Sequence, residues 1–194
     1  VIASRTLKIF GMGESAVEAK LRDRMNALTN PTLAPYAKTG EVELRITAKA
    51  ATVEEARALI VPVEEEVRGM FGPLVYGADV ASMEAVVLGL LKEKGLTLGT
   101  AESCTGGLVA KRMTDLAGSS AVFKGGVVSY TNEVKAGVLG VPQAMLDEFG
   151  AVSAQVARAM AQGARRVLGC DLAVSLTGVA GPNPDDRGNP VGLV

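Results

Sequence analysis

The first part of the chain shows two patterns typical of β-strands. Hydrophobic residues alternate with charged ones over residues 41–50 ("EVELRITAKA"), which predicts a half-buried strand. Residues 4–10 alternate in part and predict another strand, and residues 73–77 predict a short closing one. Residues 29–40 are rich in Pro, Asn and Gly, so we expect a loop there.

Two helices are predicted between these strands. Apolar residues recur at helical spacing over residues 17–28. A second helix is predicted from the capping box formed by Thr52 and Glu55. Its apolar phase continues past Pro62, so we expect a kink there rather than an end. The resulting order is βαβαβ, a small α+β domain over residues 1–80.

After residue 80 the pattern alternates between helical and strand periods. The predicted helices and strands are, in order, helix 81–95, strand 96–103, helix 106–117, strand 119–132, helices 133–140, 142–150 and 153–169, and strand 170–178. The strand at 170–178 is apolar throughout, which predicts burial on both faces. This alternation favours a three-layer α/β/α domain over residues 81–194. Residues 188–194 have the pattern of another strand, so we expect a domain truncated at its C-terminal end.

Composition indicates a globular protein and gives no sign of a nucleic-acid or membrane surface. Hydrophobic residues make up 48% of the chain and charged residues 21%, enough to build a core. The formal net charge is −1, with acidic and basic residues nearly balanced in each half, which argues against nucleic-acid binding. We find no long apolar run and no signal peptide. The 2 cysteines lack a C-x-x-C pattern, so we expect reduced thiols and a cytoplasmic protein.

The absence of histidine restricts the chemistry that the chain can perform. With 0 His residues, it cannot build a Ser-His-Asp or Cys-His site from its own side chains. The usual His-based zinc sites are excluded as well. A general base must therefore be Lys, Tyr, Asp or Glu unless another chain supplies one. We expect no metal and no cofactor.

Polar residues gather where three predicted strands end, at residues 101–107, 127–135 and 175–182. In open α/β sheets, ligands bind at the carboxyl ends of the strands. The first junction also opens a helix, whose free N–H groups favour an anion or a developing oxyanion. Gly106 and Gly107 would let a ligand approach the backbone. Alternatively, Ser103 and Thr105 only cap the helix.

The second junction carries Tyr130, Asn132 and Lys135. A lysine can serve as the base for a serine when burial lowers its pKa, and a tyrosine can relay the proton. Alternatively, the lysine is solvated and the tyrosine is packing. Asn132 either contacts a substrate or shapes the turn. The third junction is a Gly-rich turn that either cradles a phosphate or binds nothing.

Two neighbours of Ser103 leave further alternatives open. Cys104 is the better intrinsic nucleophile, but free cysteines are usually buried and inert, so we expect a packing role. Glu102 could orient a ligand, balance Lys135 or form a structural ion pair.

Four ordered motifs, "TAESCTGGLVAKRMTDLAGSS", "GGVVSYTNEVKAGVLGV", "GAVS" and "SLTGVAGPNP", resemble the C-terminal domain of the CinA family, the nicotinamide mononucleotide deamidases. This resemblance covers residues 81–194. Residues 1–80 resemble the middle, KH-type domain of the longer CinA (competence-damage inducible) proteins. The resemblance therefore implies a KH-like domain followed by an α/β amidohydrolase domain.

The resemblance implies hydrolysis of nicotinamide mononucleotide to nicotinic acid mononucleotide and ammonia, in pyridine nucleotide salvage and NAD metabolism. By position, Ser103 matches the nucleophile, Tyr130 and Lys135 match its activating partners, and Thr177 matches a substrate contact. It also implies a basic residue beyond position 194. We expect the substrate-binding residues to be Glu102, Thr105, Gly106, Gly107, Asn132, Thr177, Gly178 and Gly181.

Other functions stay open at this point. The KH-like half raises the alternative of a nucleic-acid-binding module, although the basic residues for tight phosphate contact are missing. A regulatory protein that binds a pyridine nucleotide without turning it over is a further alternative. The partner we expect is a small-molecule substrate, bound by a homodimer without nucleic acid or membrane.

Overall fold

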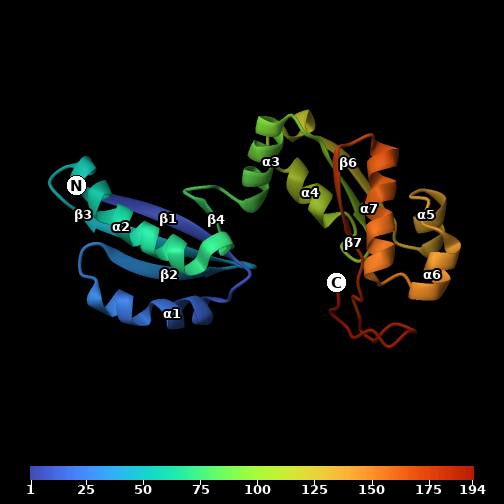
Figure 1. Cartoon of the computed structure of the whole chain (residues 1–194), viewed down its shortest axis with the longest axis horizontal. Coiled ribbons are helices and arrows are strands. Elements are labelled where there is room, and N and C mark those ends of the chain that lie inside the picture. Colours follow the sequence, from blue (N-terminus) through green and yellow to red (C-terminus); the bar gives the residue numbers. More distant parts are fainter. The chain divides into compact units, whose positions relative to one another are not determined.

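The computed structural model of the chain describes all residues, 1–194, and divides them into two compact units. The first unit covers residues 1–86 and the second residues 87–194. Each unit has its own sheet (Figure 1). Each also has its own core of buried apolar side chains. None of the helices combines the length and the apolar character needed to cross a lipid bilayer.

The first unit is an antiparallel sheet with two helices. Its elements are β1 (Ile2–Phe10), α1 (Glu14–Ala27), β2 (Thr32–Lys38), β3 (Glu41–Lys49), α2 (Val53–Phe71), the 3₁₀ turn η1 (Gly72–Leu74) and β4 (Val75–Ala78). The strand order is β2-β3-β1-β4 and every pairing is antiparallel. The topology is therefore βαββαβ, a split βαβ arrangement.

The prediction of a loop over residues 29–40 is wrong, because strand β2 lies there. Its position at the edge of the sheet explains how a proline-containing segment forms a strand. Pro35 has no N–H to donate, and an edge strand needs ladder donors on one side only. Leu33 pairs with Ile46 of β3 and adds a buried side chain to the core. The predicted βαβαβ order thus gains one strand.

The core of the first unit lies on one face of its sheet. Leu7 of β1 pairs with Leu44 of β3, and both side chains are fully buried. Both helices contribute apolar residues to this same cluster. The Thr52–Glu55 capping box is present, which confirms the predicted start of α2. Pro62 lies inside α2, and the helix continues past it as expected.

The second unit is a layered α/β domain. Its elements are α3 (Met83–Lys94, in this unit from Val87 onward), β5 (Leu98–Glu102), α4 (Leu108–Thr114), the 3₁₀ turn η2 (Ser119–Ala121), β6 (Phe123–Val128), α5 (Asn132–Gly137), α6 (Gln143–Phe149), α7 (Ala154–Leu168) and β7 (Leu172–Leu176). The parallel strand order is β6-β5-β7. Helix α7 covers one face and α4 the other, with one apolar cluster on each side (Figure 1). The predicted fold class is confirmed.

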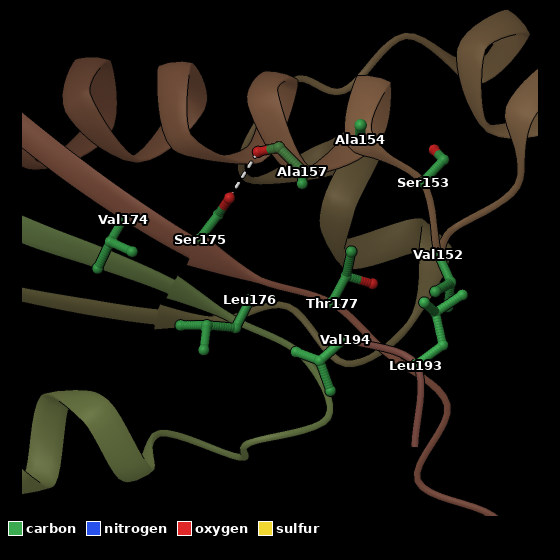
Figure 2. A pocket seen from close by; sticks show the side chains of 10 residues that line it. All are labelled: Val152, Ser153, Ala154, Ala157, Val174, Ser175, Leu176, Thr177, Leu193 and Val194. Atoms are coloured by element: carbon green, nitrogen blue, oxygen red, sulfur yellow. Dashed lines mark hydrogen bonds between the residues drawn. The ribbon is translucent and has the colours of Figure 1, made fainter. Parts of the chain in front are cut away.

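Strand β7 is not buried on both faces, contrary to the prediction from its apolar run. Ser175 faces α7 and donates a hydrogen bond to the Ala157 carbonyl, whereas Val174 points to the other side and is 41% exposed (Figure 2). The reason is that β7 lies at the edge of the sheet, while α4 packs on β5 and β6. An apolar cavity of about 520 Å³ lies along β7. The strand expected over residues 188–194 is also not formed.

Parallel pairing brings the three polar junctions together. Glu102 at the end of β5 pairs with Val128 at the end of β6 and with Leu176 at the end of β7. All three strands therefore end at the same edge of the sheet. The segments that follow them meet there and form the candidate site.

We expect Thr52→Ala to lower the free energy of unfolding by about 1 kcal/mol, because the Thr52 side chain accepts a hydrogen bond from the Glu55 N–H at the start of α2. Urea denaturation followed by circular dichroism measures this change. The matched control is Thr29→Ala, an exposed threonine outside any helix cap. Equal effects of the two substitutions would contradict the role given to the cap.

Candidate active site

The centre of the site is a contact between a serine hydroxyl and a lysine amine. Lys135 Nζ lies 3.0 Å from Ser103 Oγ. Ser103 directly follows β5, and Lys135 is on α5, the short helix that follows β6. Both side chains are buried, at 7% and 1% exposure respectively. The alternative of a solvated Lys135 is therefore wrong.

The amine of Lys135 has no acidic partner. It forms no ion pair, and its other contacts are the backbone oxygens of Ser129 at 2.8 Å and Tyr130 at 3.3 Å. Burial lowers the pKa of the Lys135 amine from its usual 10.5, because the charged form loses solvation, and this outweighs the opposite effect of nearby Cys104. The environment therefore favours the neutral amine.

The three oxygen partners of Lys135 match the three N–H bonds of an ammonium group, and they also match a neutral amine that turns its lone pair to one of them. A neutral amine has two N–H bonds and one lone pair. The carbonyls of Ser129 and Tyr130 can only accept hydrogen bonds, so they take the two N–H bonds. In the ammonium form the third N–H bond is donated to Ser103 Oγ, and in the neutral form the lone pair is left for the Ser103 hydroxyl. This is the geometry in which a lysine can remove a proton from a serine.

Glu102 organises the first junction without lining the cleft that holds Ser103 and Lys135. Its fully buried carboxylate accepts hydrogen bonds from the N–H groups of Val109 and Ala110 and from the hydroxyl of Thr105. Burial opposes ionisation, but these donors outweigh it and lower the pKa of Glu102. Glu102 thus caps the start of α4, and the alternative that Ser103 caps this helix is wrong.

The glycines of the first junction shape the turn between β5 and α4. Gly106 and Gly107 have φ values of +61° and +98°, which favour glycine. The Gly106 N–H donates to the Ser103 carbonyl at 3.0 Å. By contrast, the N–H groups of Cys104 and Thr105 have no acceptor within the chain. These two donors are next to the Ser103 hydroxyl in the sequence and remain available for a ligand.

A cleft of about 350 Å³ opens beside Ser103 and Lys135. Seven of the predicted site residues line it, namely Ser103, Tyr130, Asn132, Lys135, Thr177, Gly178 and Gly181. The other four, Glu102, Thr105, Gly106 and Gly107, are not among its lining residues, and their predicted contact with a substrate stays a prediction. The larger cavity along β7 is lined by no titratable side chain (Figure 2). We therefore place the candidate chemistry in the smaller cleft.

Tyr130 contributes to the site through its backbone oxygen and, separately, through its side chain. Its backbone oxygen accepts from Lys135, whereas its side chain is 69% exposed and lines the cleft. The phenol hydroxyl makes no hydrogen bond to Ser103 or Lys135. A proton relay through this hydroxyl stays a prediction.

Close packing joins the first and third junctions. A Cβ atom on Gly178 would lie 3.1 Å from Cys104 Sγ and 2.6 Å from the Leu193 oxygen, so only glycine fits there. Cys104 lies close to Gly178, but it is half-buried and lines the cleft, so the expected packing role stays a prediction. The Thr177 hydroxyl donates to the Ala151 carbonyl at 2.8 Å, which ties the end of β7 to the segment before α7.

Sequence reasoning missed several residues of the site. Ser129 contributes only a backbone oxygen, which no side-chain pattern reveals. Asn183 and Asp185 line the cleft from a segment without regular structure. Asp185 is the acidic residue among the lining side chains. The "PNPDDRG" stretch is rich in turn-forming residues, and that composition was the one available signal.

Comparison with known families agrees with this arrangement. Residues 80–194 match the CinA C-terminal domain, and residues 4–77 match the damage-inducible protein CinA KH domain. Together the two matches define a KH-type domain followed by a CinA C-terminal domain. The chain belongs to the CinA family, which confirms the resemblance inferred from its motifs.

Similar proteins carry names from the same family. A CinA-like protein of Dictyoglomus turgidum is 48% identical over 194 residues, covering 100% of this chain and 47% of the relative. A CinA-like protein of Kosmotoga olearia is 47% identical with the same coverage. The chain thus spans about half the length of these relatives.

Solved structures resemble part of the chain. The competence damage-inducible protein A of Klebsiella pneumoniae has a TM-score of 0.55 and 37% identity, covering 56% of this chain and 68% of that one. The competence/damage inducible protein CihA of Agrobacterium tumefaciens has a TM-score of 0.52 and 45% identity, covering 56% and 66%.

We expect Lys135→Met to raise the free energy of unfolding at pH 7 by about 1 kcal/mol, because it removes a buried amine that has no acidic partner. The native amine has a lowered pKa, so between that value and 10.5 the unfolded chain binds more protons. Stability of the unsubstituted chain therefore rises with pH across this interval. The difference in free energy of unfolding between Lys135→Met and the unsubstituted chain should therefore become smaller as the pH rises. Urea denaturation at several pH values measures this difference. Lys124→Met, at an exposed position, is the control; destabilisation by Lys135→Met at every pH would contradict this account.

Proposed function

We propose that the second unit of this chain is an amidohydrolase that converts nicotinamide mononucleotide and water to nicotinic acid mononucleotide and ammonia. The observation that carries this proposal is the 3.0 Å contact between Ser103 Oγ and the amine of Lys135, which is buried and forms no ion pair with a carboxylate. Such a pair supports acyl transfer without histidine. The resemblance of the site motifs to the nicotinamide mononucleotide deamidases of the CinA family supports the choice of substrate.

In the first half of the proposed reaction, Ser103 Oγ attacks the carboxamide carbon and its proton passes to Lys135 Nζ. The tetrahedral adduct then collapses, and the protonated amine returns the proton to the departing NH₂ group. Ammonia leaves, and an ester joins Ser103 to the nicotinoyl group. The carbonyls of Ser129 and Tyr130 hold the amine throughout these transfers.

In the second half, water attacks the ester carbon and gives a proton to Lys135. That proton returns to Ser103 Oγ as the acyl bond breaks, so the enzyme is restored and the acid product is released. The free N–H groups of Cys104 and Thr105 are the candidates to stabilise the negative oxygen of both adducts. They follow the nucleophile directly in the sequence.

We expect Ser103→Ala and Lys135→Met to lower ammonia release from nicotinamide mononucleotide by at least about a thousandfold, because each removes a member of the reacting pair. A coupled ammonia assay on residues 1–194 measures the loss. Ser120→Ala and Lys124→Met change the same residue types at exposed positions outside the cleft and should retain activity. Full activity in the Ser103→Ala variant would refute the proposed nucleophile.

A second readout separates catalysis from binding. The Ser103→Ala variant should still bind nicotinamide mononucleotide, because the hydroxyl is needed for attack rather than for affinity. Binding without ammonia release by the unsubstituted chain would instead favour a regulatory nucleotide-binding protein.

A further inference from the structure

The position of the Tyr130 side chain at the cleft is not explained by a hydrogen bond of its hydroxyl. The residue is 69% exposed, although it lines a cleft whose reacting residues are buried. The hydroxyl has no hydrogen-bond partner within the chain, while the backbone of the same residue is fixed by the bond from Lys135. The ring therefore stands at the entrance of the cleft on an anchored backbone. It is also the one aromatic ring among the residues that line this cleft.

The charges of the cleft suit a cation at this entrance. The charged groups among the lining residues are the buried Lys135 and Asp185. The Asp185 carboxylate accepts hydrogen bonds from the backbone N–H groups of Arg187 and Asn189 and from the Asn189 side chain. The bond from the Asn189 side chain is the main cause that lowers the pKa of Asp185, so its negative charge persists at neutral pH. The cleft therefore has an aromatic ring and a carboxylate among its lining side chains, while the amine of Lys135 is buried.

We propose that the ring of Tyr130 recognises the positively charged pyridinium ring of the substrate by stacking, in the cleft that also holds the Asp185 carboxylate. An aromatic face attracts a cation within about 6 Å through its quadrupole. This proposal rests on the proposed function, and it adds a preference for cationic pyridinium amides over neutral ones. Tyr130 is then a specificity residue, and its ring matters rather than its hydroxyl.

The test compares two nucleotides that differ in ring charge. Nicotinamide mononucleotide carries a cationic ring, whereas its reduced form has a neutral dihydropyridine ring with the same amide, ribose and phosphate. Dissociation constants are measured on the Ser103→Ala variant, which prevents turnover. The quantity of interest is the ratio of the two constants, because effects on the shared amide, ribose and phosphate cancel.

We expect Tyr130→Leu to reduce the preference for the cation by about two- to fivefold, the range for a cation over an exposed aromatic ring. Tyr130→Phe should keep the preference, and Tyr130→Trp should strengthen it. Val167→Ala, on α7 outside the cleft, is the control with no expected change. The exposure of the Tyr130 ring means that these substitutions leave the core intact.

An unchanged ratio in Tyr130→Leu would overturn the inference, as would equal losses in the Phe and Leu variants, because that result assigns the role to the hydroxyl. Failure of both nucleotides to bind would overturn it as well. If the Tyr130 substitutions do not change the ratio but the unsubstituted chain releases ammonia, the proposed function is supported and this inference is refuted. A ring-dependent ratio without any ammonia release would support the inference and refute the proposed function.

Discussion

The site of this CinA family chain depends on the burial of one amine without an acid beside it. Lys135 is 1% exposed, and its nitrogen meets two backbone oxygens and the hydroxyl of Ser103. A solvated lysine would hold its proton at neutral pH and could not act as a base. Burial weakens that hold, and the two carbonyls fix the nitrogen 3.0 Å from the serine hydroxyl. The chain thereby gains a candidate base although it contains no histidine.

The carboxylate of Glu102 leaves Lys135 without an acidic partner, because it binds the start of α4 instead. If Glu102 were paired with Lys135, the attraction would favour the charged amine and remove the base. The structure instead directs Glu102 to the N–H groups of α4, where those donors and Thr105 satisfy its charge. The same bonds fix the turn that carries Ser103. The same hydrogen bonds therefore stabilise the first junction and keep the Glu102 carboxylate from pairing with the amine.

Local patterns predicted most of this fold but not its edges. The capping box at Thr52 and the carboxyl-end position of Ser103 and Lys135 were both readable from the sequence. Strand β2 was missed because an edge position tolerates Pro35, and the exposed face of β7 was missed because burial depends on which helices cover a strand. Contacts made through the backbone, such as the Ser129 oxygen, leave no side-chain signal. The residue types indicated which side chains can react, and the fold determined which of these side chains are in contact.

The most direct test of the account is the pKa of Lys135 itself. Titration of the lysine side-chain Cε–Hε signals by NMR, with the Lys135 signal assigned by its loss in Lys135→Met, measures this value in the folded chain. The account predicts a pKa below the usual 10.5, because burial without an acidic partner favours the neutral amine. A value at or above 10.5 would show a stabilised ammonium and would contradict the proposal that Lys135 is the base for Ser103.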